Sequence, residues 1–226
     1  MEVSSTSIQN SQLTKSPLGD LGVKVCGMRS AENIRQIEQL GVDWMGFIFY
    51  PKSPRFVSEF PSYLPVKTKR VGVFVNETKD NITKTATRFA LDFVQLHGNE
   101  SPEFCVEMGK IGLKVIKAFS IGNEFPSEEV NRYEGVCNYF LFDTKTPQHG
   151  GSGRKFNWEI LSNYIGNTPF LLSGGISPKD AESIRQFNHP KLIGIDINSK
   201  FETNPALKDV ELVKIFINKL CQRSEL

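Results

Sequence analysis

The chain has 226 residues, 39% of them hydrophobic, which is enough for one large α/β domain or two small ones. Its 27 Lys and Arg residues nearly balance 25 Asp and Glu residues, so no global field would recruit nucleic acid or an acidic membrane. No run of about eighteen apolar residues predicts a transmembrane helix. Four scattered cysteines without C-x-x-C spacing argue against a zinc site and a disulfide framework, and favour a reducing, cytoplasmic compartment.

Residues 1–22 are rich in Ser, Thr and Gln, and they lack the basic start and apolar core of a signal peptide. We predict a flexible N-terminal extension there and a single domain over residues 23–226. Strand-like and helix-like segments alternate along this domain. The first four pairs are expected as strand 23–28 with a helix between Ser30 and Gly41, strand 44–50 with a short helix in 58–64, strand 70–76 with helix 79–91, and strand 92–98 with a helix from Ser101.

The second half of the chain repeats the alternation. The pairs expected there are strand 113–121 with a weak helix at 127–134, strand 139–144 with helix 158–165, strand 169–175 with a helix from Ser177, and strand 192–199 with helix 208–221. Eight such units predict a parallel sheet closed into a (β/α)8 TIM barrel. The alternative is an open doubly wound sheet, but the Gly-x-Gly-x-x-Gly turn that would favour it is missing after the first strand.

In such a barrel, chemistry sits at the C-terminal ends of the strands. Polar residues occupy almost every predicted strand end, which is typical of an active-site rim. They are Cys26, Arg55, Gln95, His97, Asp143, Ser173, Asp196, Asn198 and Ser199. Alternation along the first strand places Lys24 and Cys26 on one face. Taken alone, Cys26 is as well explained as a small buried apolar residue.

Gly174-Gly175 precedes Ser177-Pro178-Lys179-Asp180, which predicts a helix with an N-cap serine, an N1 proline and an N3 acid. The free N–H groups of such a helix start form a natural phosphate cradle, although an ordinary capped helix explains the motif equally well. Arg55 between prolines could pair with a carboxylate or simply lie at the surface. The glycine-rich loop 149–155 is either a flap that closes on a ligand or a plain flexible loop.

Several motifs together resemble those of the phosphoribosylanthranilate isomerases, enzymes of the tryptophan pathway. They fall in family order over roughly residues 23–220, and are Lys24-Val25-Cys26-Gly27-Met28, Gly46-Phe47-Ile48-Phe49, Ser53-Pro54-Arg55, Gly72-Val73-Phe74-Val75-Asn76, Gln95-Leu96-His97-Gly98, Phe142-Asp143-Thr144, Gly150-Gly151-Ser152-Gly153 and Ser173-Gly174-Gly175-Ile176. The resemblance implies an Amadori rearrangement of N-(5-phosphoribosyl)anthranilate, in which an acid opens the ribose ring and a base removes the C2 proton. Neither step needs a metal or a redox cofactor.

By position, the resemblance makes Cys26 the general base and Asp143 the general acid. A cysteine base needs its pKa lowered from about 8.5, and Lys24 on the same face is the candidate for lowering it. An aspartic acid that donates a proton needs its pKa raised from about 3.9. The other implied roles are Arg55 for the anthranilate carboxylate, Gln95, His97 and Asp196 around the substrate, and Gly174, Gly175, Asn198 and Ser199 for the phosphate.

One departure from the family pattern follows the last strand. Many relatives have Ser-Ser-Gly-hydrophobic-Glu there, whereas this chain has Asn198-Ser199-Lys200-Phe201-Glu202. The change removes a glycine and adds a cation, so Lys200 is expected either to bind phosphate or to point into solvent.

Two other functions remain open at this point. One is another phosphate-binding barrel enzyme such as the histidine-pathway ProFAR isomerase, which typically has an aspartate where Cys26 stands. The other is a barrel that binds a phosphorylated ligand without catalysis. The expected partner is a phosphorylated small molecule, with no nucleic acid or membrane, and the protein is expected to be a monomer or homodimer.

Overall fold

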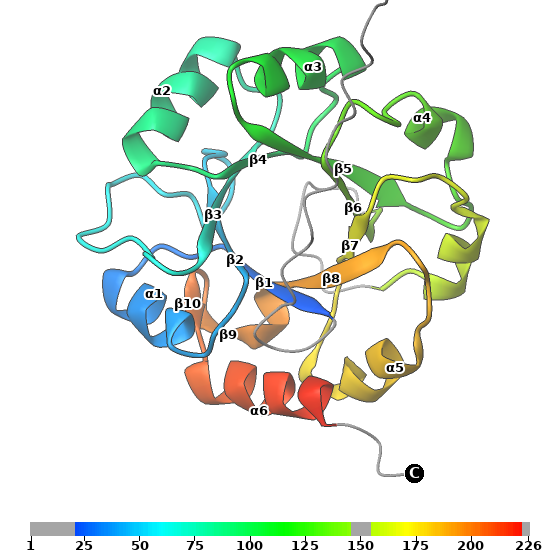
Figure 1. Cartoon of the computed structure of the whole chain (residues 1–226). Helices are drawn as coiled ribbons and strands as arrows, with labels where there is room; N and C mark the ends of the chain where they lie inside the picture. The colour runs from blue at the N-terminus through cyan, green and yellow to red at the C-terminus, as the bar shows by residue number, and fades with distance from the viewer. Residues whose placement is uncertain (1–20, 146–154, 223–226) are drawn as a thin grey trace, which may run out of the picture.

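The computed structural model describes residues 21–145 and 155–222, and its centre is a closed barrel of eight parallel strands (Figure 1). The strands follow one another in chain order, and β1 pairs with both β2 and β8. This closure confirms the predicted (β/α)8 barrel and excludes the open sheet. The strands are β1 Gly22–Cys26, β2 Trp44–Ile48, β3 Lys69–Phe74, β4 Phe93–Leu96, β5 Lys114–Ile121, β6 Tyr139–Thr144, β7 Phe170–Leu172 and β8 Leu192–Ile197.

Helices surround the barrel and pack their apolar faces against it (Figure 1). The α-helices are α1 Ala31–Glu38, α2 Lys79–Phe89, α3 Pro102–Lys110, α4 Ser127–Asn131, α5 Ala181–Gln186 and α6 Val210–Cys221. Three short 3-10 helices are η1 Trp158–Asn163, η2 Pro178–Asp180 and η3 Ser199–Phe201. Within the described part of the chain, no helix is both long enough and apolar enough to span a membrane.

The structure departs from the sequence-based expectation in three places. No helix forms in 58–64, where Pro61 and the nearby Pro65 interrupt any helical hydrogen-bonding pattern. The helix predicted at 158–165 is the 3-10 helix η1. A small antiparallel hairpin, β9 Glu202–Asn204 and β10 Leu207–Lys208, follows β8 and was not predicted. Residues 1–20 and most of the glycine-rich loop, 146–154, lie outside the described residues.

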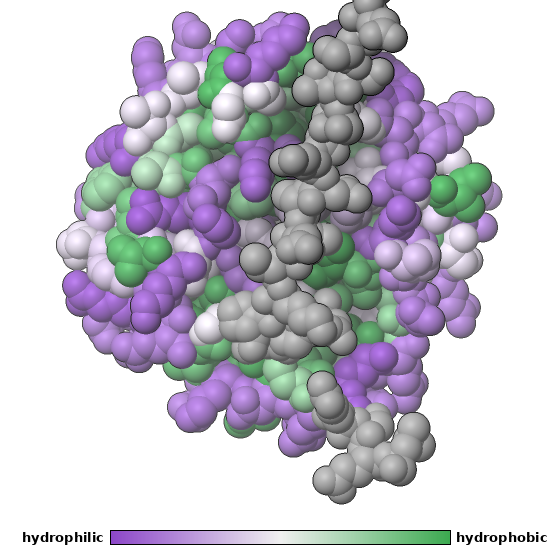
Figure 2. All heavy atoms as spheres, in the orientation of Figure 1, coloured by the Kyte–Doolittle hydropathy of each residue, from purple (hydrophilic) through white to green (hydrophobic). Residues whose placement is uncertain are grey.

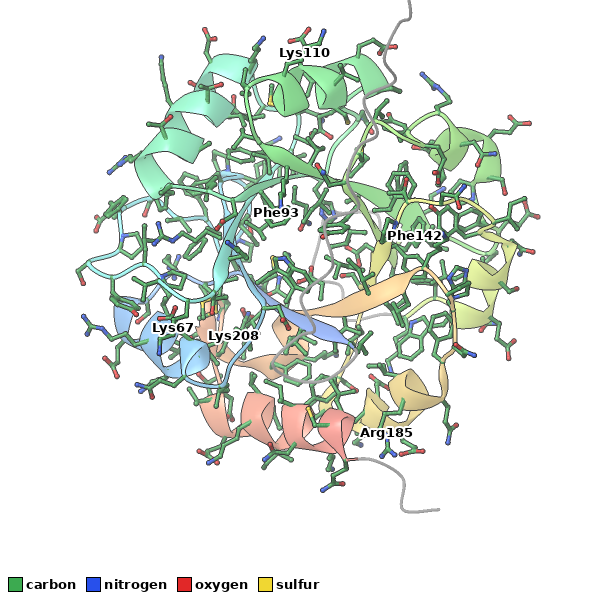
Figure 3. The ribbon with its side chains drawn as sticks, in the orientation of Figure 1. Lys67, Phe93, Lys110, Phe142, Arg185 and Lys208 are labelled. Atoms are coloured by element: carbon green, nitrogen blue, oxygen red, sulfur yellow. The ribbon has the colours of Figure 1, made fainter. Side chains whose placement is uncertain are left out.

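The core has two parts, which the period-2 alternation of the strands separates. The larger lies between the barrel wall and the helices. The smaller fills the barrel interior with Val71, Phe93, Ile116, Ala118, Leu141 and Leu171. Figure 3 labels one residue of each part, Phe93 inside the barrel and Phe142 outside its wall. This inner cluster fills the barrel beneath the C-terminal ends of the strands. The inward-facing polar residues at those ends therefore lie above it and form the mouth of the barrel. In the orientation of Figure 1, mainly hydrophilic side chains cover the outer edge of the molecule (Figure 2).

Glu134 fastens the loop that leads into β7. Its carboxylate accepts hydrogen bonds from the Tyr164 hydroxyl at 2.6 Å, the Asn167 amide at 3.2 Å, and both the amide and the hydroxyl of Thr168 at 3.2 and 3.0 Å. Burial opposes the charge, but these donors together hold the pKa of Glu134 below its usual range. The ionised carboxylate therefore stabilises the folded state.

Replacing Glu134 with Ala leaves these donors without their acceptor, and we expect a loss of about 2 kcal/mol in the free energy of unfolding near neutral pH. Because the folded-state pKa is depressed, the stabilisation is present above about pH 4.3 and is lost as pH falls through the folded value. Urea unfolding of Glu134→Ala and wild type at several pH values should show their difference shrinking in acid. Glu124→Ala, at an exposed site, is the control, and an equal loss in it would contradict the assignment.

Candidate active site

The inward face of β1 carries a buried ion pair that spans the closing seam of the barrel. Lys24 is opposite Asp196 in the β1–β8 register, and its Nζ lies 2.9 Å from Asp196 Oδ1. The two side chains are 0% and 7% exposed, respectively. Burial lowers the pKa of Lys24, but Asp196 and Cys26 together outweigh it, so the pKa of Lys24 is raised. The pair therefore keeps a charged ammonium within the barrel.

Cys26 ends the same strand and is buried beside a glycine. Gly46 of β2 is its register partner, and a Cβ on Gly46 would lie only 2.6 Å from Cys26 Sγ. The thiol fits because this position has no side chain. Sequence reasoning noted Gly46 only as part of a motif; its role was not visible because strand register was unknown.

Lys24 acts on the pKa of Cys26 in the expected direction, but the pKa is raised overall rather than lowered. Burial raises the pKa of the Cys26 thiol, and the positive charges of Lys24 and Lys208 offset that effect only in part, while Asp196 adds to it. Lys24 is already compensated by Asp196, so a thiolate would be a second anion beside one ammonium. Burial therefore favours the thiol form of Cys26 over the thiolate.

Asp143 ends β6 and meets a histidine from β4. His97 Nε2 lies 3.3 Å from Asp143 Oδ2, while Asp143 Oδ1 accepts the Thr144 amide at 2.8 Å. The Gln95 amide nitrogen lies 2.9 Å from His97 Nδ1, which assigns the His97 proton to Nε2, facing Asp143. Asp143 and His97 also act electrostatically on Asp196. These contacts bring Gln95, His97, Asp143 and Asp196 together at one mouth, as predicted.

Gly174 and Gly175 both adopt positive φ, 90° and 65°, and pass close to the end of β6. A Cβ on Gly174 would lie 2.2 Å from Thr144 Oγ1 and 3.0 Å from Asp143 Oδ1. Glycine at position 174 thus lets this backbone lie close to the residues around Asp143. Ser177 caps the next turn through its amide and hydroxyl, which both donate to Asp180 Oδ2 at 2.6 and 2.7 Å.

Arg55 is neither free nor at the surface. Its Nε lies 2.9 and 3.1 Å from the two Glu202 oxygens, and its Nη2 lies 2.7 Å from Oε2. Lys208 Nζ donates to Glu202 Oε1 at 2.5 Å and to Asn198 Oδ1 at 2.7 Å. Asn198 Oδ1 is thus engaged by a cation. Lys200, the cation expected near the phosphate or in solvent, is exposed.

Sequence reasoning missed Glu202 and Lys208, because both lie on the hairpin that it did not predict.

Two polar side-chain atoms at the mouth have no hydrogen-bond partner among the described residues. They are Gln95 Oε1 and Thr144 Oγ1, and both are buried. Buried polar groups are usually satisfied, so these two atoms suit a polar ligand.

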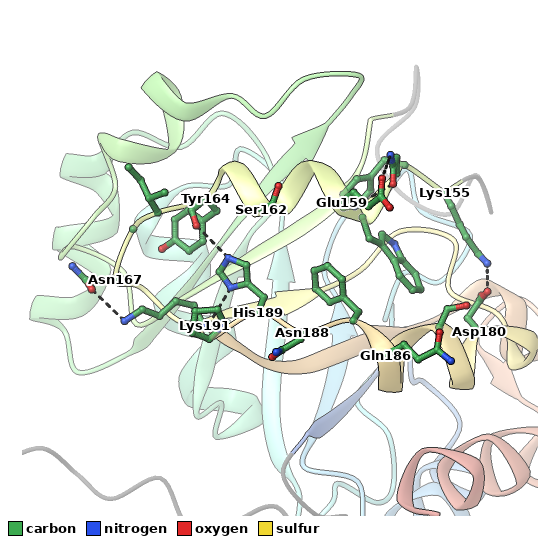
Figure 4. Close-up of a pocket in the computed structure, with 18 residues that line it drawn as sticks. Lys155, Glu159, Ser162, Tyr164, Asn167, Asp180, Gln186, Asn188, His189 and Lys191 are labelled. Atoms are coloured by element: carbon green, nitrogen blue, oxygen red, sulfur yellow. Dashed lines mark hydrogen bonds and ion pairs between the residues drawn. The ribbon is translucent and has the colours of Figure 1, made fainter. Parts of the chain in front are cut away.

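A hollow lies outside the barrel, between η1 and α5 (Figure 4). Of the described residues that line it, none is among the predicted site residues. Its dashed contacts join Lys155 to Asp180, Lys191 to Asn167 and His189 to the Tyr164 carbonyl and the Lys191 amide. These contacts tie neighbouring outer loops together.

Comparison with known proteins gives consistent matches. The model of the family described as N-(5'phosphoribosyl)anthranilate (PRA) isomerase matches residues 23–219. An N-(5'-phosphoribosyl)anthranilate isomerase of Phocaeicola vulgatus is 56% identical over 201 residues, covering 89% of this chain and 98% of the relative. The solved phosphoribosyl anthranilate isomerase of Thermotoga maritima aligns with a TM-score of 0.76 and 34% identity, covering 88% of this chain and 98% of that one.

A further solved phosphoribosyl anthranilate isomerase is in complex with reduced 1-(o-carboxyphenylamino)-1-deoxyribulose 5-phosphate. It aligns with a TM-score of 0.73 and 31% identity, over 88% of this chain and 98% of that one.

Replacing Lys24 with Met removes one partner of the buried pair and leaves the Asp196 carboxylate unpaired. We expect the free energy of unfolding to fall by about 3 kcal/mol, as for other buried pairs broken on one side. Urea unfolding measures the loss, and Lys24→Met/Asp196→Asn should recover part of it because no charge is then stranded. If the double variant were no more stable than Lys24→Met alone, the interpretation of Lys24 and Asp196 as a charged pair would be contradicted.

Proposed function

The chain belongs to the N-(5'-phosphoribosyl)anthranilate isomerase family, and we propose that it converts N-(5-phosphoribosyl)anthranilate to 1-(2-carboxyphenylamino)-1-deoxyribulose 5-phosphate in tryptophan biosynthesis. One observation above all supports this: Cys26 and Asp143 end parallel strands at one barrel mouth, both beside the Lys24–Asp196 pair. The catalytic domain is the barrel, residues 23–226.

The first step is opening of the ribose ring, with Asp143 as general acid. The Asp143 carboxylic acid donates its proton to the ring oxygen as the C1–O bond breaks, and a cationic imine forms between C1 and the anthranilate nitrogen. His97 holds one oxygen of Asp143 and Gln95 holds His97, so the carboxyl group is oriented before substrate binds.

The second step is proton removal at C2, with Cys26 as general base. The thiolate takes the C2 proton, the C2–H electrons form the C1–C2 double bond, and the imine electrons return to nitrogen. The resulting enaminol becomes the ketone when its hydroxyl proton is lost and C1 gains a proton. The reaction is an isomerisation, so no oxidant or reductant is consumed.

The rest of the mouth binds the substrate in this proposal. Arg55 pairs with the anthranilate carboxylate through charge-assisted hydrogen bonds. Gly174 and Gly175, whose backbone approaches Asp143 and Thr144, face the phosphate together with Asn198 and Ser199. Gln95 Oε1 and Thr144 Oγ1, buried without partners among the described residues, are available to the ribose hydroxyls.

Cys26→Ala and Asp143→Asn are each expected to reduce kcat by about 10²–10⁴-fold, the usual contribution of a proton-transfer group. The assay follows anthranilate fluorescence with substrate generated in situ, and circular dichroism checks the fold. Cys221→Ala, at an exposed cysteine, should retain full activity. Near-normal turnover by Cys26→Ala would remove the base assignment.

The pH dependence follows from the burial of Cys26. Since burial raises the pKa of the thiol above the ordinary value, its titration should have a midpoint above about pH 8.5, the value expected of an exposed thiol; the ultraviolet absorbance of the thiolate, taken as the difference between wild type and Cys26→Ala, measures this. The sign follows from the charge: burial disfavours the thiolate, so this form is scarce below the raised pKa. A plateau that begins near neutrality would show that the free enzyme already holds a thiolate.

A further inference from the structure

The hairpin β9–β10 reaches the barrel mouth through two residues to which the proposed reaction assigns no role. Glu202 and Lys208 are buried, with 5% and 0% of their side chains exposed, and both are charged residues. Charged side chains are rarely placed so deeply without a function or a partner. Their shared neighbour is Arg55, on the loop after β2.

We propose that Glu202 and Lys208 are positioning residues, which hold the Arg55 guanidinium in the orientation and with the net charge needed to bind the aromatic carboxylate of the substrate. The inference rests on the proposed function, because it takes that carboxylate as the ligand of Arg55.

The first argument is geometric. A guanidinium offers two edges for bidentate pairing, the side edge of Nε and Nη2 and the end edge of Nη1 and Nη2. Glu202 takes the side edge of Arg55 through contacts of 2.7 to 3.1 Å. Among the described residues no partner is recorded for Nη1, so the end edge remains for a second carboxylate. Glu202 therefore fixes the guanidinium plane and does not compete for the ligand edge.

The second argument is electrostatic. An isolated Arg55–Glu202 pair would be neutral and would attract a carboxylate only weakly. Lys208 adds a second cation 2.5 Å from Glu202, so two cations and one anion leave one net positive charge at the mouth. Burial opposes ionisation of Glu202, but Arg55 and Lys208 outweigh it and keep its pKa below the usual range. Burial lowers the pKa of Lys208, and the Glu202 carboxylate opposes that shift, so the positive charge of Lys208 depends on its pairing with Glu202.

The third argument is rigidity. The Asn33 side chain of α1 accepts from the Lys208 amide at 2.8 Å and donates to its carbonyl at 2.9 Å, and Asn33 is itself buried. Figure 3 labels Lys208 on the barrel side of α1. On the opposite side, a Cβ on Gly27 would lie 2.7 Å from Arg55 Cδ and 2.8 Å from Asn198 Oδ1. Arg55 is therefore held between a fixed hairpin and the end of β1.

The test compares two ligands that differ in one group: the reduced product, 1-(2-carboxyphenylamino)-1-deoxyribitol 5-phosphate, and its phenylamino analogue without the carboxylate. Binding of both to wild type, Glu202→Gln and Lys208→Met is measured by calorimetry, with turnover in parallel. We expect each variant to weaken binding of the carboxylate ligand by about tenfold, the scale of one charge-assisted contact, and to change binding of the analogue by less than about twofold. In Glu202→Gln, KM should rise while kcat stays within about twofold.

Matched controls separate this role from a general effect of charge or stability. Lys219→Met removes an exposed cation from α6 and Glu211→Gln removes an exposed acid from the same helix; neither should change either affinity. In an Arg55→Ala background, Glu202→Gln should have no further effect on the carboxylate ligand. Should Glu202→Gln fail to fold, Lys208→Met and the Arg55→Ala background with Lys208→Met test the same coupling.

Three results would overturn the inference: tighter binding of the carboxylate ligand by Glu202→Gln, which would make Glu202 a competitor; equal losses for both ligands; or a Glu202→Gln effect that persists without Arg55. The binding experiment needs no turnover. A wild-type protein without isomerase activity would refute the proposed function, whereas failure of this inference would appear in the binding data of the variants, as one of these three results.

Discussion

Closure of the barrel between its first and last strands is the constraint on which the rest of the site depends. Lys24 and Asp196 are 172 positions apart in sequence, yet the parallel register of β1 and β8 puts them opposite each other. A charged pair buried here is unfavourable unless both partners are present with good geometry. The pair therefore favours the one closed register in which Cys26, Asp196 and the hairpin after β8 share one mouth.

Around the junction of β1 and β8, glycines shape the site as much as the larger side chains do. Gly46 leaves the volume that Cys26 Sγ occupies, and Gly174 lets the end of β7 reach Thr144 and Asp143. Both positions sit where two neighbouring strands must approach closely, and any Cβ would force one of them away. In the proposed reaction Cys26 and Asp143 transfer protons, and such groups need placement to within a fraction of an ångström, so that proposal gives these glycines a part in positioning both groups.

The barrel fold and most of the polar residues at its mouth could be predicted from the sequence, because the periodicity of a strand and the residue types at its end are local properties. Cys26, Gln95, His97, Asp143 and Asp196 could all be placed at the mouth from these alone. The contacts of Arg55 could not, because its partner Glu202 is 147 positions away on a hairpin too short to leave a periodic signal. The pKa of Cys26 was missed for a related reason: Lys24 was visible as a neighbour, but its prior pairing with Asp196 and the depth of burial depend on tertiary structure.

A neutral Cys26 is consistent with the proposed order of events. Before substrate binds, burial and the Asp196 carboxylate disfavour a Cys26 thiolate more than the nearby cations Lys24 and Lys208 favour it. Ring opening, assisted by Asp143, creates a cationic imine at C1, directly beside the C2 proton. In a buried site of low dielectric, that new charge lowers the free energy of a nearby thiolate far more than it would in water. The acid step therefore creates a cation that favours loss of the Cys26 proton to solvent, and with it formation of the thiolate that takes the C2 proton.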